Sequence, residues 1–81
     1  MSQQLRNTDL LLAMAKRLQG LRAEKKLSQE IVYNDTGIHI ARIETAKTNI
    51  SVSQLQALCN YYNISLQDFF AEGFESFHIK S

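Results

Sequence analysis

The chain has 81 residues, a net charge of only +1 and a hydrophobic share of 44%. This length suits one compact core, and no apolar run approaches the roughly 20 residues that a membrane-spanning helix needs. The start, MSQQLRNTDL, lacks the basic-then-apolar layout of a signal peptide, so we expect one cytoplasmic domain. The single cysteine, Cys59, has no cysteine or histidine at metal-ligand spacing, which argues against disulfide and zinc chemistry.

The first predicted helix opens at Asn7 or Thr8. Lys16, Arg17 and Lys25 fall on its outer face. Apolar residues recur at the three- and four-residue intervals that place side chains on one face of a helix, namely Leu11, Met14, Ala15, Leu18 and Leu21. We therefore expect an amphipathic helix that packs this stripe into the core.

The stretch LSQEIVYNDTGIHIARIE predicts two short helices joined by a tight polar turn. Ser28 is a good N-cap for a helix over residues 29–33. Asn34-Asp35 favours a turn, and Thr36 then caps a helix over residues 37–45. Two helices connected in this way form a helix-turn-helix.

Two more helices are predicted after a polar loop at residues 47–49. Ser51 caps the fourth helix, and Asn63 suits a left-handed stop after it. Ser65 caps a short fifth helix that runs to Glu72. The apolar stripe of the fourth helix is Val52, Leu55, Leu58, Cys59 and Tyr62. Every predicted element is helical, and the absence of proline fits an all-α domain.

The ending FESFHIKS allows two interpretations. Phe77 and Ile79 alternate with Ser76, His78 and Lys80, a period of two that is typical of a strand. A lone strand on a helical monomer would need a two-fold partner to supply the second strand. The alternative is a frayed terminus.

The charge is distributed unevenly along the chain. Residues 1–50 hold eight Lys or Arg against five Asp or Glu, a balance of +3, whereas residues 51–81 hold one against three, a balance of −2. Such polarity would turn the N-terminal part toward phosphate groups. A chance asymmetry on a solvated surface would look the same.

Four motifs in this order carry a family resemblance: Leu21-Arg22, the LSQ at 27–29, the segment from Thr36 that ends in RIE at Glu44, and NISVSQLQALCNYYNISLQDFF at 49–70. From Ala15 to Phe70 the chain resembles the phage-repressor or XRE-type (lambda-repressor-like) helix-turn-helix DNA-binding domains. The resemblance implies a compact five-helix domain over residues 8–72. Residues 73–81 would form a short C-terminal tail and possible dimerisation element.

The sequence departs from the family pattern in two places. The span from Gln29 to the expected cap at Thr36 is about three residues shorter than usual, so the second helix should lose roughly one turn. The glycine that usually follows the third helix is replaced by Ala46.

The resemblance also implies roles for single residues. Gln29 matches the position that brings an amide and a backbone N–H to a phosphate. Gly37 and Ile38 match the first base-facing positions, where Ile38 would meet a thymine methyl or instead join the core. Arg42 would bind a guanine edge or a phosphate. Arg22 and Glu44 would form a structural ion pair.

The remaining polar residues near this helix are expected to bind phosphates or pack locally. His39 is a phosphate contact or a partly packed surface residue, because no second histidine or carboxylate stands at i+4 for metal or catalytic work. The tyrosines, Tyr33, Tyr61 and Tyr62, are expected at the edge of the core. The full predicted DNA-binding set is Gln29, Thr36, Gly37, Ile38, His39, Arg42, Lys47, Thr48 and Asn49.

Taken together, these features predict a sequence-specific regulator that binds double-stranded DNA as a homodimer on a palindromic operator. An antitoxin that uses the same fold to bind a toxin partner is the alternative. We expect no enzyme, because no nucleophile, base and orienting group come together in the sequence. No cofactor, small-molecule substrate or membrane partner is expected.

Overall fold

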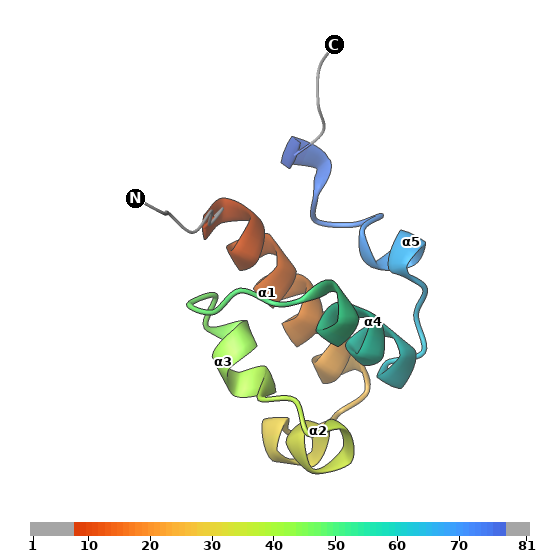
Figure 1. Ribbon diagram of the computed structural model, residues 1–81. Helices are drawn as coiled ribbons and strands as arrows, with labels where there is room; N and C mark the ends of the chain where they lie inside the picture. Colours follow the sequence, from red (N-terminus) through yellow and green to blue (C-terminus); the bar gives the residue numbers. More distant parts are fainter. Residues whose placement is uncertain (1–7, 78–81) are drawn as a thin grey trace.

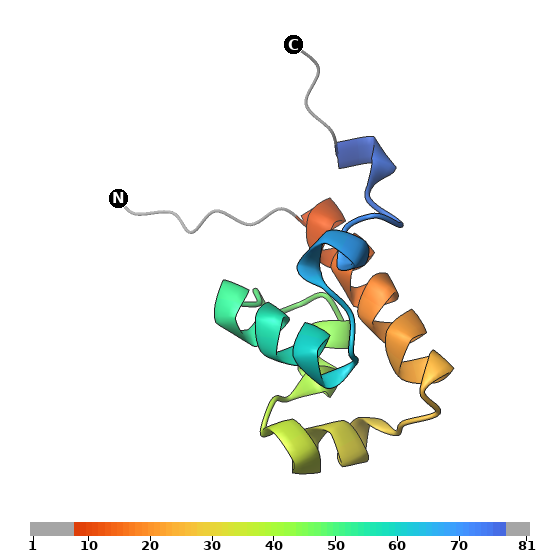
Figure 2. The same ribbon diagram turned by 90° about the vertical axis from the view of Figure 1, so that its right-hand side faces the viewer.

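The computed structural model describes residues 8–77, and every regular element in that range is helical (Figure 1). The elements are α1 (Thr8–Glu24), α2 (Gln29–Thr36), α3 (Ile40–Glu44), α4 (Val52–Tyr61), α5 (Leu66–Phe69) and the 3-10 turn η1 (Glu75–Phe77). In both views α2 lies at the end of the molecule where α1 finishes, and η1 lies at the opposite end (Figure 1, Figure 2). The predicted all-α, five-helix fold is confirmed.

The core draws side chains from all five helices. α1 packs against α3, α2 packs against both α3 and α4, and α4 packs against α5. The stripe predicted for α1 is buried as expected. The most deeply buried large side chains are Leu18, Val32, Ile40, Leu58, Tyr62 and Phe69. Burial of these apolar surfaces is the main contribution that holds such short helices together.

The end of α2 differs from the prediction. Ser28 is its N-cap as expected and accepts a hydrogen bond from the Ile31 N–H. The helix does not stop at Asn34-Asp35 but continues to Thr36, whose hydroxyl donates to the Val32 carbonyl at 2.8 Å. Gly37 then ends the helix at φ 75°, a left-handed conformation that glycine adopts without steric cost. Thr36 therefore closes α2 and is not the cap of α3.

The third helix begins later than predicted. His39 is its N-cap, although the His39 side chain makes no capping hydrogen bond, and the helix has five residues. The expectation that the second helix loses a turn is wrong, because α2 keeps eight residues. The span from Gln29 to the observed cap at His39 is three residues longer than the span to Thr36. It is α3 that is short.

The caps predicted for the last two helices are confirmed. Ser51 accepts from the Gln54 N–H, and the Gln54 side chain accepts from the Ser51 N–H, so the two residues form a capping box. Asn63 has the expected left-handed conformation at φ 60°. Ser65 accepts from the Asp68 N–H at the start of α5.

The fifth helix ends at Phe69, although the sequence predicted an end at Glu72. The Arg17 side chain of α1 donates to the carbonyls of Phe69 and Asp68, each at 2.9 Å. Carbonyls at the end of a helix have no partner within it, and the guanidinium satisfies two of them. Arg17 therefore fastens α5 to α1 and does not lie on a free outer face.

The strand interpretation of the tail is wrong for the described part, because residues 75–77 form the 3-10 turn η1. The preceding Gly73 has φ 89°. Phe69 is fully buried, and Phe74 is partly buried against the core. His78, Ile79, Lys80 and Ser81, and Asn7 at the other terminus, lie outside the described residues.

Candidate nucleic-acid interface

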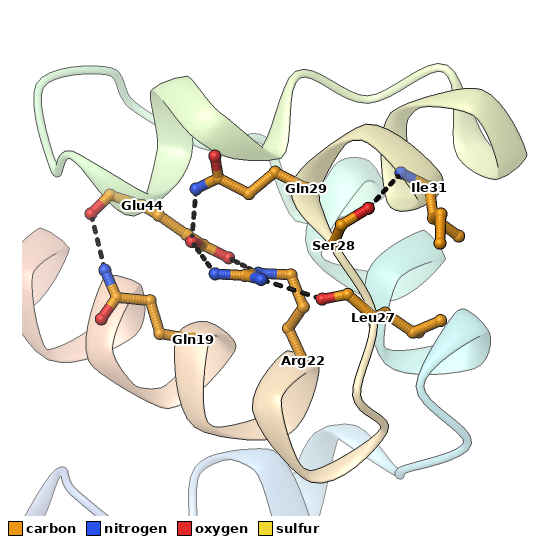
Figure 3. Close-up of polar contacts among 7 residues, drawn as sticks. All are labelled: Gln19, Arg22, Leu27, Ser28, Gln29, Ile31 and Glu44. Carbon is orange, nitrogen blue, oxygen red and sulfur yellow. Dashed lines mark hydrogen bonds and ion pairs between the residues drawn. The ribbon is translucent and has the colours of Figure 1, made fainter.

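The C-terminal end of α3 is fixed by a charged junction around Glu44 (Figure 3). The Glu44 side chain is only 2% exposed, and its two carboxylate oxygens accept from Arg22 Nε at 2.8 Å and Nη2 at 2.9 Å. This two-bond geometry is the strong form of an Arg–carboxylate pair. The predicted ion pair between α1 and α3 is confirmed.

Further hydrogen bonds complete the junction. Arg22 also donates to the Leu27 carbonyl at 2.9 Å, and Gln19 donates to the Glu44 carbonyl at 3.2 Å. The pKa of Arg22 is raised above its usual value, chiefly because its charged form donates hydrogen bonds to Glu44. The junction therefore ties α3 to α1 and to the segment that precedes α2.

Gln29 belongs to the same junction. Its amide Nε2 donates to Glu44 Oε1 at 2.8 Å (Figure 3). A primary amide carries two N–H groups and one carbonyl oxygen, so this bond engages only one of the two donors. Gln29 is the first residue of α2, where the backbone N–H groups of a helix have no partner in the helix itself. Glu44 thus holds the Gln29 side chain in orientation, while the second amide N–H of Gln29 is left as a donor.

The N-terminal end of α3 faces a small open hollow of about 180 Å³. Six of the nine predicted DNA-binding residues line it, together with Ile43 and Gln54. The six are Gly37, Ile38, His39, Arg42, Thr48 and Asn49. The other three, Gln29, Thr36 and Lys47, lie outside its lining. The turn before α3, α3 itself and the loop after it thus converge on one surface.

Gly37 and Ile38 precede α3 and do not lie on it. A Cβ at position 37 would meet no atom within 4 Å, so the left-handed φ, and not a lack of room, is what requires glycine there. Ile38 is partly buried and packs against the core. It therefore takes the core role that the sequence left open, while its remaining surface still borders the hollow.

His39 and Arg42 are two of the exposed residues that line the hollow. The His39 ring stacks on Tyr33 with the ring centroids 4.6 Å apart and the planes at 30°. Arg42 is exposed, and no residue between 8 and 77 forms an ion pair with its guanidinium. A free guanidinium next to a fixed imidazole can donate several hydrogen bonds outward.

Gln54 is a lining residue that the predicted set lacks. Its carbonyl oxygen accepts from the Ser51 N–H at 3.3 Å, which leaves the amide nitrogen as a donor. The signal for it in the sequence is the spacing of the capping box, a Ser followed three residues later by Gln. That spacing fixes the Gln side chain at the start of α4, beside the loop that carries Thr48 and Asn49.

The three tyrosines occupy different environments. Tyr62 lies in the core, and Tyr61 is partly buried and donates to Asp35 at 2.6 Å. Tyr33 is 43% exposed, so its expected place at the edge of the core is wrong. Burial is the main cause that raises the pKa of Tyr62, to about 12.

Residues 8–77 lack two other features, a metal-binding cluster and a membrane-spanning helix. No group of three metal-capable side chains occurs in that range. No described helix is long and apolar enough to cross a membrane.

The comparison with protein families gives the class of this domain. The model of the Cro/C1-type HTH DNA-binding domain matches residues 17–71, more than half of the chain. The protein belongs to this family, and the predicted resemblance is confirmed. A search of curated proteins and a search of solved structures found no match.

Proposed function

We propose that this protein is a sequence-specific transcriptional regulator that acts in the cytoplasm as a homodimer on a palindromic operator. The observation that carries the proposal is the hollow beside α3, where six predicted contact residues, the exposed Arg42 among them, meet on one surface. Family membership supplies the DNA-binding class. The specificity, the symmetry of the site and the exclusion of catalysis are our proposal.

The residues in and beside the hollow divide into two roles. Arg42 is exposed on α3 itself, where a bidentate contact to the O6 and N7 atoms of guanine is the commonest base-specific contact of arginine. Lys47, Thr48 and Asn49 lie on the loop after α3 and would bind phosphates, which positions the domain without reading sequence. Gln54 adds one amide donor to that phosphate-facing side.

Gln29 and the turn residues would complete the footprint. Gln29 would present its second amide N–H and the N-terminus of α2 to a phosphate on the other side of the groove. His39 would donate to a phosphate from the end of α3. Gly37 would allow a close approach of the backbone, and Thr36 would fix the turn through its two hydrogen bonds.

A dimer follows from the length of α3. Five helical residues can contact only a few base pairs, which is too little to specify a site in a genome. Two-fold pairing on half-sites about 34 Å apart doubles the sequence that is read. In this proposal residues 8–72 are the DNA-binding unit, and residues 73–81 contribute to pairing.

Selection of bound duplexes from a random DNA pool tests the proposal. We expect enrichment of an inverted repeat whose half-sites are separated by about one helical turn. The matched control is Arg42→Ala, which should enrich sequences more weakly while it retains general affinity. A pool that stays random with the wild-type protein would contradict the proposed specificity.

A further inference from the structure

A second hollow lies next to the start of α4 and is almost entirely apolar. Its volume is about 270 Å³. It is formed by the first half of α1, the loop before α4, the start of α4 and the residue after α5. The lining residues that matter below are Leu10, Leu11, Asn49, Val52 and Phe70. We call this surface the Val52 face.

Two large apolar side chains stand exposed at this surface. Val52 is 76% exposed and Phe70 is 43% exposed, although both belong to ordered segments of the fold. Exposed apolar side chains beside an apolar hollow are typical of a surface that is covered in the working assembly. Neither side chain contributes to the described core cluster.

The charge pattern separates the Val52 face from a larger hollow among the described residues. That hollow, about 460 Å³, is lined by Asp9, Lys16, Arg17 and Glu72. The lining of the Val52 face includes no ionisable side chain. In a two-fold contact a surface meets its own copy, so charges near the axis would face like charges. The Val52 face carries no charge in its lining that could meet a like charge across the axis.

We propose that the Val52 face binds a second copy of this chain, with the projecting Val52 of each protomer packed at the apolar hollow of its partner. The inference rests on the proposed function, which requires a dimer, and names the surface that forms it. It replaces the predicted β-strand pairing as the main dimer contact. Leu10, Leu11, Val52 and Phe70 all lie outside the tail of residues 73–81 that the sequence suggested for dimerisation.

The position of Asn49 supports this partner. Asn49 lines both the Val52 face and the hollow at the start of α3. A second copy on the Val52 face would therefore lie directly beside the DNA-contacting surface. A two-fold axis here places one DNA-contacting hollow on each side of it, as the two half-sites of a palindrome need.

Sedimentation of the full chain without DNA tests the inference. We expect the wild-type protein to sediment at twice the 9.3 kDa mass of one chain at tens of micromolar. Val52→Glu should weaken association at least tenfold, because it buries a charge against its own copy. Position 52 is the first residue of α4, where an acidic side chain favours the helix, so the variant should remain folded.

Leu12→Glu is the matched control. Leu12 is 45% exposed on α1 and lines the charged hollow, not the Val52 face. The control should remain dimeric, and a melt of each variant checks the fold. A monomeric wild type, or equal loss of the dimer in both variants, would overturn the inference. A different protein that co-purifies with the wild type but not with Val52→Glu would also overturn it.

Val52→Lys shows whether Val52→Glu loses DNA binding because the dimer dissociates or because glutamate repels phosphate. Both charged variants should dissociate the dimer and lose cooperative binding to a palindrome, although lysine attracts phosphate and glutamate repels it. If only the glutamate variant lost DNA binding and both stayed dimeric, the inference would fail and the proposed function would stand. If the wild type paired through this face yet bound no DNA, the proposed function would fail and the inference would stand.

Discussion

The two ends of α3 contrast sharply. At its C-terminal end, Glu44 is buried and its carboxylate accepts three hydrogen bonds, two from Arg22 and one from Gln29. From its N-terminal cap, His39, to its middle residue, Arg42, the helix has exposed side chains beside an open hollow, and the Arg42 guanidinium forms no ion pair with another described residue. One end is fastened to α1 and α2, whereas the other presents its donors to solvent.

This difference separates positioning from recognition within a helix of five residues. A short helix has little stability of its own, so its orientation depends on contacts at one end. The fastened end supplies these contacts through Arg22 and Glu44. The open end can then vary its side chains with little effect on the fold, since exposed substitutions away from such contacts rarely change stability much.

The largest expected effect is on the fastened end. Glu44→Gln should lower the free energy of unfolding by about 3 kcal/mol, because one amide oxygen cannot accept three hydrogen bonds and the Arg22 charge loses its partner. We place it at the lower end of the range for buried pairs because the Arg22 side chain is still 22% exposed. Chemical denaturation measures the loss.

Glu24→Gln, on the exposed end of α1, is the control for that measurement and should change stability by less than about 0.5 kcal/mol. Arg22→Met should destabilise in the same direction as Glu44→Gln. A loss below about 1 kcal/mol for Glu44→Gln, the range of exposed ion pairs, would show that the junction does not fasten α3.

The next effect concerns the open end. Lys47 is exposed on the loop after α3, so Lys47→Ala should weaken binding to all duplexes alike. The slope of log affinity against log salt should fall by about one unit, as expected for the loss of one phosphate contact. Titrations at several salt concentrations measure it. An unchanged slope would remove Lys47 from the interface.

A smaller effect is expected from the tyrosine in the core. The Tyr62 hydroxyl is buried and has no hydrogen-bond partner among the described residues, so Tyr62→Phe should be neutral or stabilise by up to about 1 kcal/mol. Burial raises the pKa of Tyr62 to about 12, above the value near 10 of an unfolded chain.

The direction of the pH effect follows from that shift. A raised tyrosine pKa means that the folded state favours the neutral hydroxyl, so its stabilising contribution is complete below pH 10 and is lost as the pH rises from about 10 to 12. Thermal melts across this range should show a shallower fall for Tyr62→Phe than for the wild type. Parallel curves would contradict the burial of this hydroxyl.

The smallest expected effects concern backbone strain at two non-glycine residues, one after α3 and one after α1. Ala46 and Lys26 have left-handed φ values of 61° and 56°. Lys26 is exposed, so Lys26→Gly should relieve strain and stabilise by about 0.5–1 kcal/mol. Ala46 is buried against Leu11 and Ala15, so Ala46→Gly loses a packed methyl group and should gain almost nothing. Equal gains would show that this packing is unimportant.

Much of the fold could be predicted because the signals were local. Caps at Ser28, Ser51 and Ser65 depend on hydrogen bonds that span three residues, and the structure has all three. The apolar stripe of α1 follows directly from helical periodicity. The ion pair of Arg22 and Glu44 came from the family resemblance, since nothing local joins residues 22 positions apart.

The errors arose where a residue had two possible local roles, or where a contact joined residues that are distant in the sequence. Thr36 can cap a following helix or close a preceding one, and Gly37 decided between them by ending α2 in the left-handed conformation. The Arg17 side chain donates to two carbonyls at the end of α5, more than fifty positions away, and no local pattern contains these hydrogen bonds. The capping box fixes the Gln54 side chain at the start of α4, but its place in the lining of the hollow depends also on the tertiary position of α4.

The central claim is that the open end of α3 reads sequence while other contacts only position the domain. Its most direct test is the affinity of the wild type and of Arg42→Ala for the selected duplex and for a scrambled one. We expect Arg42→Ala to lose roughly 1–3 kcal/mol on the selected duplex and little on the scrambled one. Equal losses on both duplexes would make Arg42 a phosphate anchor and contradict the account.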